Sequence, residues 1–421
     1  MAILRTGNEL RKILDAYLPF TKGGKLKPKK QLVTIVASNS TFPNDLFTRA
    51  MAQASAEDRG SPQIVQYSYT SVLMAGDDPG KTKSRLTWTS NRSPCGIGAE
   101  SINAILSREA EACGADMLFL GLDHFVAPKL EDAPIANGPV GFNDQVAELR
   151  IHDAQSALKP ILGRNVNLTD ATAAKYVNYM VSPQYQKYRK DFLDAVKYGN
   201  PAWAMIDTGH LPLILNFATT RDILDAVRKE LGNHDVILEA ELSSTGKSGD
   251  RVGYVCWKGM KEEMRQTEIR LALNFIDYTN ADAIAYDIGM KHAAKLKESF
   301  EPDIEKLIAI QEALYIDIGS YRKVGRHIPF VQHGGSGASE IPLGLVGKVN
   351  KSTAYQRAAA QADYGWCVAH ATEIASGEKT AISEVRHLGT VDAMRVACVG
   401  FLKETQTYGI APKCREILGK S

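Results

Sequence analysis

The chain has 421 residues, of which 44% are hydrophobic and 23% are charged. This composition is typical of a globular protein that buries a large core, and it excludes disorder as the main state of the chain. The 50 basic and 48 acidic side chains leave a formal net charge of +2. A general nucleic-acid binder would carry a much stronger positive balance, so we expect no nucleic-acid partner.

Cysteine spacing and hydropathy indicate the cellular compartment of the protein. The six cysteines show no close spacing of the kind used in disulfide frameworks or four-cysteine zinc sites. The N-terminal stretch MAILRTGNELRKILDAY lacks the apolar centre of a signal peptide, and no apolar run reaches the length of about 18 residues needed to span a membrane. The one basic cluster, Thr21 to Lys30, is interpreted as a solvated linker. We expect a cytoplasmic protein that does not bind membranes.

Short apolar segments rich in β-branched residues alternate along the chain with segments of helical spacing. The predicted helices cover 44–58, 101–114, 219–232 and 268–280. A chain that alternates in this way forms a parallel sheet, and eight repeats close it into a (β/α)8, or TIM, barrel. The eight predicted strands are QLVTIVAS from Gln31, QIVQYSY from Gln63, MLFLGLDH from Met117, AWAMIDTG from Ala202, DVILEAEL from Asp235, AIAYDIG from Ala283, IPFVQHGG from Ile328 and LGLVGKVN from Leu343.

Two intervals depart from a minimal barrel. An insertion at about 130–200 separates the third and fourth strands, and it contains Tyr176, Tyr179, Tyr185 and Tyr188. We expect these rings to pack in the interior or at a subunit interface rather than to line a lid over a ligand. The link GSGASEIP between the seventh and eighth strands is too short for a crossover helix. With closing helices at about 354–421, the whole chain is predicted to be one domain.

Polar residues concentrate at the predicted C-terminal ends of the strands, where such barrels carry their chemistry. A catalytic zinc ion commonly takes three protein ligands and keeps one position open. Three histidines at three strand ends, beside carboxylates able to transfer protons, therefore predict a metal centre. The strand-end residues are Asp123, His124, Asp207, Glu239, Glu241, Asp287, His292 and His333.

The orientation of these side chains follows from strand geometry. Adjacent residues on a strand face opposite sides, so Asp123 and His124 both point into the barrel only if the third strand ends there. The following segment FVAPKL is compatible with such an end, which we expect. Glu239 and Glu241, two residues apart, share one face of their strand.

The glycine-rich stretch HGGSG, His333 to Gly337, has backbone N–H groups that can surround an anion. Phosphate sites of these barrels often lie on the loops after the seventh and eighth strands. We therefore expect a phosphate site here. The segment GIGAES from Gly96 is a poor dinucleotide-binding pattern, because Ser101 stands at its third glycine position.

Several motifs resemble those of class II, zinc-dependent fructose-bisphosphate aldolases, of which the chain looks like a divergent member. PFVQHGGSG followed by VGKVNKST resembles the family's HGGSG loop and KVN strand. LGLDH, AMIDTGHLPLILNFATTRDIL, LEAELSSTG and DAIAYDIGMKH resemble further family segments in the same order. The resemblance covers most of residues 31 to 355, apart from the insertion.

The resemblance implies a site in which His124, His292 and His333 bind zinc, although three imidazoles also accept other divalent ions. It associates Glu241 with a second or alternative metal position. It also assigns to Asp123 the proton of the substrate's C4 hydroxyl group. The stretch TGKSGD lies where the family usually carries a proton-donating glutamate in a mobile loop, and Asp250 is the candidate donor there.

The resemblance further implies a site for a ketose phosphate. A bisphosphate needs a cation at its far end, for which Arg386 is the candidate. The residues that match phosphate-binding or substrate-binding positions of the family are Gly334, Gly335, Ser336, Asn350, Thr353 and Ser68.

The implied activity is the reversible retro-aldol cleavage of fructose 1,6-bisphosphate to dihydroxyacetone phosphate and glyceraldehyde 3-phosphate. A metal that polarises the ketone oxygen stabilises the resulting enediolate without a lysine Schiff base. Two alternatives stay open. One is an aldolase for another ketose phosphate, such as tagatose bisphosphate or a sulfonated or deoxy ketose phosphate; the other is a non-catalytic barrel that binds metal or sugar phosphate. The resemblance also suggests a homo-oligomer, either a dimer or a tetramer.

Overall fold

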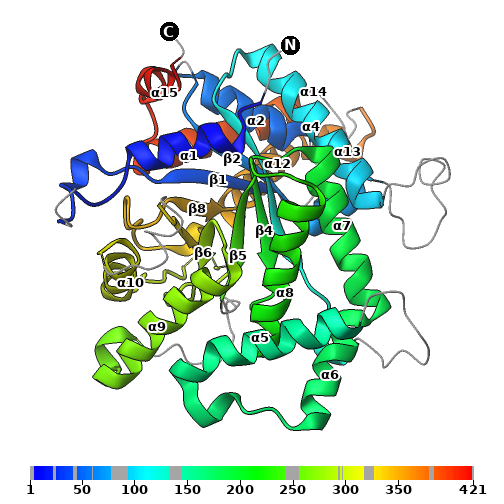
Figure 1. Cartoon of the computed structure of the whole chain (residues 1–421). Coiled ribbons are helices and arrows are strands. Elements are labelled where there is room, and N and C mark those ends of the chain that lie inside the picture. Colours follow the sequence, from blue (N-terminus) through cyan, green and yellow to red (C-terminus); the bar gives the residue numbers. More distant parts are fainter. Residues whose placement is uncertain are drawn as a thin grey trace.

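A closed barrel of eight parallel strands, ordered β1 to β8, forms the centre of the molecule (Figure 1). The computed structural model describes residues 4–21, 25–40, 45–58, 60–76, 93–132, 144–242, 256–292, 294–295, 297–316, 327–378 and 384–419. The predicted (β/α)8 barrel is confirmed. The strands are β1 (Ile35–Ser40), β2 (Gln63–Ser68), β3 (Leu118–Val126), β4 (Trp203–Asp207), β5 (Ile237–Glu241), β6 (Ala283–Ala285), β7 (Phe330–Gln332) and β8 (Lys348–Lys351).

Each strand overlaps the segment predicted from its apolar, β-branched composition, and β1, β3 and β8 extend past the predicted C-terminal ends. Every residue of β1 is buried, because a barrel strand has the filled interior on one face and covering helices on the other. Ala37 pairs with Ile64 of β2 and with Asn350 of β8, so the hydrogen-bonded ring closes at β1. β7 begins only after Pro329, which has no N–H to donate to a neighbouring strand.

Helices cover the outside of the barrel. The predicted helix at 101–114 begins earlier, because Ser93 caps it by accepting the N–H of Gly96 at 3.3 Å and Pro94 occupies the first turn. GIGAES therefore lies inside a helix. The helices between the strands are α2 (Asp45–Ala56), α3 (Tyr69–Ala75), α4 (Pro94–Cys113), α8 (Leu213–Asp225), α9 (Glu262–Thr279) and α10 (Ile304–Ile316), and a π-helical turn, η4 (Ala226–Glu230), continues α8. Short 3₁₀ turns are η1 (Lys29–Gln31), η2 (Leu130–Asp132), η3 (Gly163–Val166), η5 (Trp257–Gly259) and η6 (Gly335–Gly337).

The insertion after β3 is helical, with α5 (Asp144–Leu162), α6 (Asp170–Val181) and α7 (Pro183–Gly199). α7 packs on α4, whereas α5 packs on α8 and α9 (Figure 1). The four tyrosines of the insertion are buried, as expected for packing residues. The hydroxyl of Tyr188 donates to the carbonyl of Phe125 at 3.1 Å, and that of Tyr179 donates to the carbonyl of Pro128 at 2.6 Å. The insertion is thereby attached to the C-terminal end of β3.

The segment after β8 forms the expected closing helices: α12 (Thr353–Ala369), α13 (Ala371–Ala375), α14 (Glu384–Glu404) and α15 (Ala411–Ile417). α14 packs against both α12 and α2, which places it across the β1 side of the barrel. Within the described parts of the chain, no helix is both long enough and apolar enough to cross a membrane.

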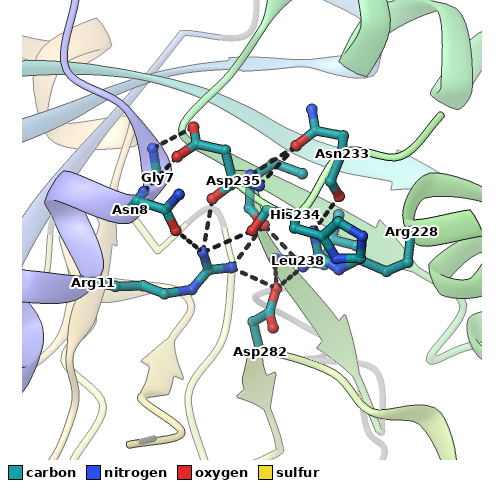
Figure 2. Close-up of polar contacts among 10 residues, drawn as sticks. Gly7, Asn8, Arg11, Arg228, Asn233, His234, Asp235, Leu238 and Asp282 are labelled. Atoms are coloured by element: carbon teal, nitrogen blue, oxygen red, sulfur yellow. Dashed lines mark hydrogen bonds and ion pairs between the residues drawn. The ribbon is translucent and has the colours of Figure 1, made fainter.

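The N-terminal end of the barrel is covered by α1 (Gly7–Ala16), which buries Leu10 and Ile13 against the first residues of several strands. A polar network fixes this helix (Figure 2). The carboxylate of Asp235 accepts the backbone N–H groups of Gly7 and Asn8 at 2.9 and 2.8 Å, which stabilises the positive end of the helix. Figure 2 also shows Arg11 directed at the carboxylate of Asp282, where Nη2 and Oδ2 lie 3.1 Å apart. The opposite, C-terminal end of the barrel is the open one.

Candidate active site and metal centre

The end of β3 differs from the expectation that the strand stops at His124. β3 continues to Val126, and its pairing with β4 shifts register between Leu122 and Phe125. His124 lies within this irregularity with φ 44°, a conformation that costs a residue with a Cβ about 1 kcal/mol or more. This bulge, rather than the end of the strand, lets neighbouring side chains reach the same end of the barrel.

Three histidine rings meet at this end of the barrel. The ring centroid of His124 lies 5.0 Å from that of His292 and 4.8 Å from that of His333, and the last two are 5.5 Å apart. One ring nitrogen from each lies within 4.8 Å of the others. The structure therefore brings the three predicted histidines together.

Carboxylates fix which nitrogen of two of these rings faces the cluster. Nδ1 of His124 lies 2.9 Å from Oδ2 of Asp207, and Nε2 of His333 lies 2.8 Å from Oε1 of Glu239. A ring N–H that donates to a carboxylate leaves the other nitrogen with a lone pair. In His333 that atom is Nδ1, which is buried and has no hydrogen-bond partner among the described residues. This pattern fits a divalent metal ion bound by imidazoles.

The electrostatics of the cluster also favour a cation. Burial lowers the pKa of His124, but the carboxylates of Asp123, Asp207 and Glu241 outweigh it and raise this pKa to about 10. Burial raises the pKa of Asp207, but its hydrogen bond and charge interaction with His124 lower it to about 2. Asp207 therefore stays ionised, and the negative charge that favours a protonated imidazole equally favours a metal ion.

Glu241 lies beside this cluster. Its Oε1 is 3.9 Å from Nδ1 of His333. Glu241, His124 and Asp207 also form a second group whose possible ligand atoms lie within 4.8 Å of one another. Glu239 and Glu241 both reach His333, as expected for residues two apart on β5. The donor set thus offers two overlapping positions for a cation.

Asp123 is fully buried beneath the cluster. Its Oδ2 accepts a short hydrogen bond from the side-chain amide of Asn39, and its Oδ1 accepts one from Asn350 at 3.2 Å. Nζ of Lys348 lies 4.0 Å from Oδ1. The two amide donors line the cavity above, so Asp123 lies directly behind the cavity wall.

A cavity of about 680 Å³ opens above the histidines. One side is formed by the ends of β1 and β2 and the start of α3, and the other by the turn after β7 and the start of α12. Its lining includes Asn39, Ser68, Tyr69, Thr70, His124, Val126, Lys291, His292, Gly334, Ser336, Asn350, Ser352, Thr353 and Gln356.

The turn after β7 presents its backbone to the cavity. Gly334 has φ 64°, and a Cβ there would lie 2.4 Å from the carbonyl oxygen of Lys291, so only glycine fits. Oγ of Ser336 accepts the N–H groups of Ser352 and Ala354 at 3.0 and 3.3 Å, which fixes the turn against the start of α12. The start of α12 borders the cavity at Ser352 and Thr353, and a helix N-terminus beside a glycine-rich turn is a suitable site for a phosphate group.

Not all of the remaining predicted site residues lie at the cavity. Ser68 lines the cavity at the end of β2, and Gly335 is buried behind Gly334. Arg386 is not brought to the cavity: it lies on α14, where Nη2 pairs with Oδ2 of Asp363 on α12 at 2.6 Å. Asp250 lies outside the described residues.

Residues 189–395 of the chain match the sequence profile of the family "Fructose-bisphosphate aldolase class-II". This part of the chain, from α7 to α14, belongs as a divergent member to this family. The enzymes of the family are aldolases, that is, aldehyde-lyases, so the chain is an aldolase-type enzyme whose substrates are sugar phosphates. No curated protein matches the chain significantly.

A solved structure of fructose-bisphosphate aldolase from Campylobacter jejuni is similar to this chain, with 18% identity, coverage of 97% of each chain and a TM-score of 0.58. At this identity the likeness concerns the fold alone. A putative fructose-1,6-biphosphate aldolase from Coccidioides immitis matches with a TM-score of 0.47. A probable tagatose 6 phosphate kinase from Sinorhizobium meliloti 1021 matches with a TM-score of 0.42. Their identities are 14% and 11%, and the matches cover 91% and 92% of this chain and 95% and 87% of theirs.

The structure adds partners for which the sequence analysis proposed no role. Asp207 and Glu239 were recognised at strand ends, but only the structure shows that they hold the family's histidines. Asn39 and Lys348, which contact Asp123, were not singled out at all. Their position on β1 and β8 could have indicated them, because metal-binding histidines are usually surrounded by a second layer of polar residues.

Proposed function

We propose that this class II aldolase cleaves fructose 1,6-bisphosphate reversibly to dihydroxyacetone phosphate and glyceraldehyde 3-phosphate. The observation that carries the proposal is the arrangement of one cavity. Its floor combines a histidine cluster that fits a metal ion with Asp123 behind the wall, and its side is a glycine-rich turn suited to phosphate.

The metal centre would be held by His124, His292 and His333, with Glu241 beside it, and zinc is the first candidate. When bound, the metal polarises the carbonyl of the ketose and stabilises the negative charge that develops there. Asp207 and Glu239 orient two of the rings through their second nitrogens. The negative charge of these carboxylates is consistent with a doubly charged ion.

Asp123 would accept the proton of the substrate's C4 hydroxyl while the C3–C4 bond breaks. Its Oδ2 is occupied by the amide of Asn39, which itself lines the cavity. The substrate hydroxyl would therefore replace the Asn39 amide as the donor to Oδ2. Asn350 and Lys348 remain on the other side of the carboxylate and hold it in place during this exchange.

The phosphate of the dihydroxyacetone half would bind at the turn after β7. Gly334 and Ser336 of this turn and Thr353 at the start of α12 line this part of the cavity. Their backbone N–H groups, with that of Gly335 buried behind them, would bind the phosphate. Asn350 is a further predicted phosphate contact, and Ser68 would contact another part of the substrate. Asp250 stays the predicted donor of the proton that converts the enediolate of this half into dihydroxyacetone phosphate.

A second candidate is cleavage of another ketose phosphate with the same dihydroxyacetone phosphate half. It is favoured by the pairing of Arg386 with Asp363, which leaves the predicted partner of a second phosphate away from the cavity. Tyr69 and Val126 form the wall opposite the phosphate turn. Tagatose bisphosphate and sulfonated or deoxy ketose phosphates are the substrates to compare.

The test is a substrate panel assayed with the metal-loaded protein. Chelator-sensitive cleavage of fructose 1,6-bisphosphate, lost in Asp123→Ala, supports the proposal. Cleavage of only another ketose phosphate would select the second candidate. If no substrate is cleaved while metal and dihydroxyacetone phosphate still bind, the chain is a non-catalytic sugar-phosphate-binding barrel.

We also propose a homo-oligomer. Exposed apolar side chains on α12 and α14, including Tyr364 at 72% exposure and Val385 at 67%, support an interface on these helices. Light scattering at several protein concentrations measures the assembly. A monomer throughout would contradict this proposal without affecting the aldolase proposal.

A further inference from the structure

A lysine lies inside the barrel beneath the metal centre. The side chain of Lys348, on β8, is fully buried. Its Nζ lies 2.6 Å from Oε2 of Glu239, 4.0 Å from Oδ1 of Asp123 and 4.9 Å from the ring centroid of Trp203. Lysine is almost never fully buried unless its charge is paired, so the two carboxylates balance the charge of this ammonium group.

Glu239 divides its two oxygens among three partners from three strands. Oε1 accepts the hydrogen bond from Nε2 of His333 on β7. Oε2 accepts one from Nε1 of Trp203 on β4 at 2.6 Å and also contacts Lys348. The carboxylate is fully buried, so these partners alone determine its orientation.

His333 in turn depends on that orientation. Its hydrogen bond to Glu239 directs the Nε2 proton away from the histidine cluster and leaves Nδ1 for the cluster. The side chain of His333 is 1% exposed, so water does not replace a lost partner. A change in the position of Glu239 is therefore transmitted to a metal ligand.

We propose that Lys348 is a positioning residue for the metal centre: by pairing with Glu239, it holds this carboxylate where it fixes the ring and the free Nδ1 of His333. Lys348 touches neither the histidine nor the cavity. Its effect on the metal passes through Glu239. This inference rests on the proposed metal centre, but it does not depend on which ketose phosphate is cleaved.

The test is the zinc affinity of metal-free protein, measured by competition with a chromophoric chelator, together with the visible spectrum of the Co²⁺-loaded protein. Lys348→Met is expected to bind zinc about 10–100-fold more weakly, as when other partners of metal-binding histidines are lost. Its Co²⁺ spectrum is expected to shift, because the ring of His333 is no longer held. Unchanged affinity and an unchanged spectrum would overturn the proposal.

Lys306 provides a matched control. This lysine is also buried, pairs with Glu268 at 2.8 Å and lies 4.0 Å above the ring of Tyr286, but none of these partners belongs to the metal centre. Lys306→Met is expected to lower the melting temperature and to leave the zinc affinity within about twofold. An equal loss of zinc affinity in both variants would mean that general destabilisation, rather than positioning, weakens the site.

A double-mutant cycle tests the route through Glu239. Adding Lys348→Met to Glu239→Gln is expected to cause no further loss of zinc affinity, because the carboxylate that Lys348 positions is already gone. A further loss as large as that of Lys348→Met alone would overturn the proposal. The double variant removes both charges of the pair, so it also serves if Lys348→Met does not fold.

If the wild-type protein binds no divalent ion, the metal centre itself is wrong, and the proposed function fails with it. If the wild type binds zinc and Lys348→Met binds it equally well, only the positioning role fails. The two failures are therefore distinguished in one experiment.

Discussion

Oδ2 of Asp207, the last residue of β4, lies 2.9 Å from Nδ1 of His124 at the bulge of β3. The two strands are neighbours, and the bulge that gives His124 its positive φ also brings its ring to the end of β4. The carboxylate therefore fixes the ring of a residue whose backbone is strained. The hydrogen bond also leaves Nε2 as the nitrogen of His124 available to a metal ion.

Asp207→Ala is expected to weaken zinc binding about 10–100-fold, because the ring of His124 loses the partner that selects its nitrogen. The measurement is chelator competition with metal-free protein. Asp225→Ala is the control, since Asp225 on α8 also forms ion pairs, with Arg150 and Arg221, but lies away from the histidines. Equal zinc affinities of Asp207→Ala and the wild type would contradict the assigned role.

Gly334→Ala is expected to raise KM for a phosphorylated substrate about tenfold, equivalent to about 1.4 kcal/mol of binding energy. The new Cβ would collide with the carbonyl of Lys291 and displace both the phosphate turn and the residue before His292. Gly377→Ala is the matched control, because Gly377 has φ 78° but no atom within 4 Å of a Cβ. Steady-state kinetics of both variants separate the collision from backbone strain, and an unchanged KM in Gly334→Ala would remove the turn from the phosphate site.

Arg386→Ala is expected to leave both kcat and KM for fructose 1,6-bisphosphate within about twofold of the wild type, because its guanidinium pairs with Asp363 and does not line the cavity. Steady-state kinetics provide the measurement. A large increase in KM would show that this guanidinium leaves Asp363 to bind the second phosphate. In that case the expectation drawn from the sequence would be right and this placement would describe only the substrate-free state.

His327 precedes β7 at the closed end of the barrel, and neither ring nitrogen has a hydrogen-bond partner among the described residues. Burial lowers its pKa from 6.5 to about 4. Between these two pH values His327 is protonated in the unfolded chain but neutral in the folded protein. The free energy of unfolding therefore falls as the pH decreases from about 6.5 to about 4, by up to about 3 kcal/mol.

His327→Leu is expected to remove this part of the pH dependence, because leucine suits the neighbouring Ile13, Leu14, Val33 and Ile35 and takes up no proton. Urea unfolding at pH 7.5 and pH 5 measures the effect. The variant should gain more stability over the wild type at pH 5 than at pH 7.5. An equal gain at both pH values would contradict the lowered pKa.

Patterns of apolar residues and turns were sufficient to predict the eight strands, because each strand carries its own local signal. The three histidines were also predictable, since they follow strands whose ends must meet in a closed barrel. The bulge at His124 was not, because its cause is pairing with β4, which no local pattern reveals. The polar residues that surround the histidines were not predictable either, because the contact between Glu239 and Lys348 joins residues more than a hundred positions apart.

Arg386 illustrates the opposite limit. An arginine was expected near a second phosphate on chemical grounds, but nothing in the sequence placed it there. Its position on α14 and its pairing with Asp363 of α12 depend on how the closing helices pack together. The chemistry of a side chain follows from the residue type, whereas the position of a residue in the C-terminal helices depends on tertiary packing.

The turn after β7 occupies the position where other strands of the barrel are followed by a covering helix. Its backbone is enclosed by the chain before His292 and by the start of α12, so added residues would have no room. The opposite rim, after β2 and β3, instead leads into α3 and a long helical insertion. The mouth of the barrel thus has one side where change is resisted and one where it is tolerated, and we expect substrate preference within this lineage to have diverged through the tolerant side.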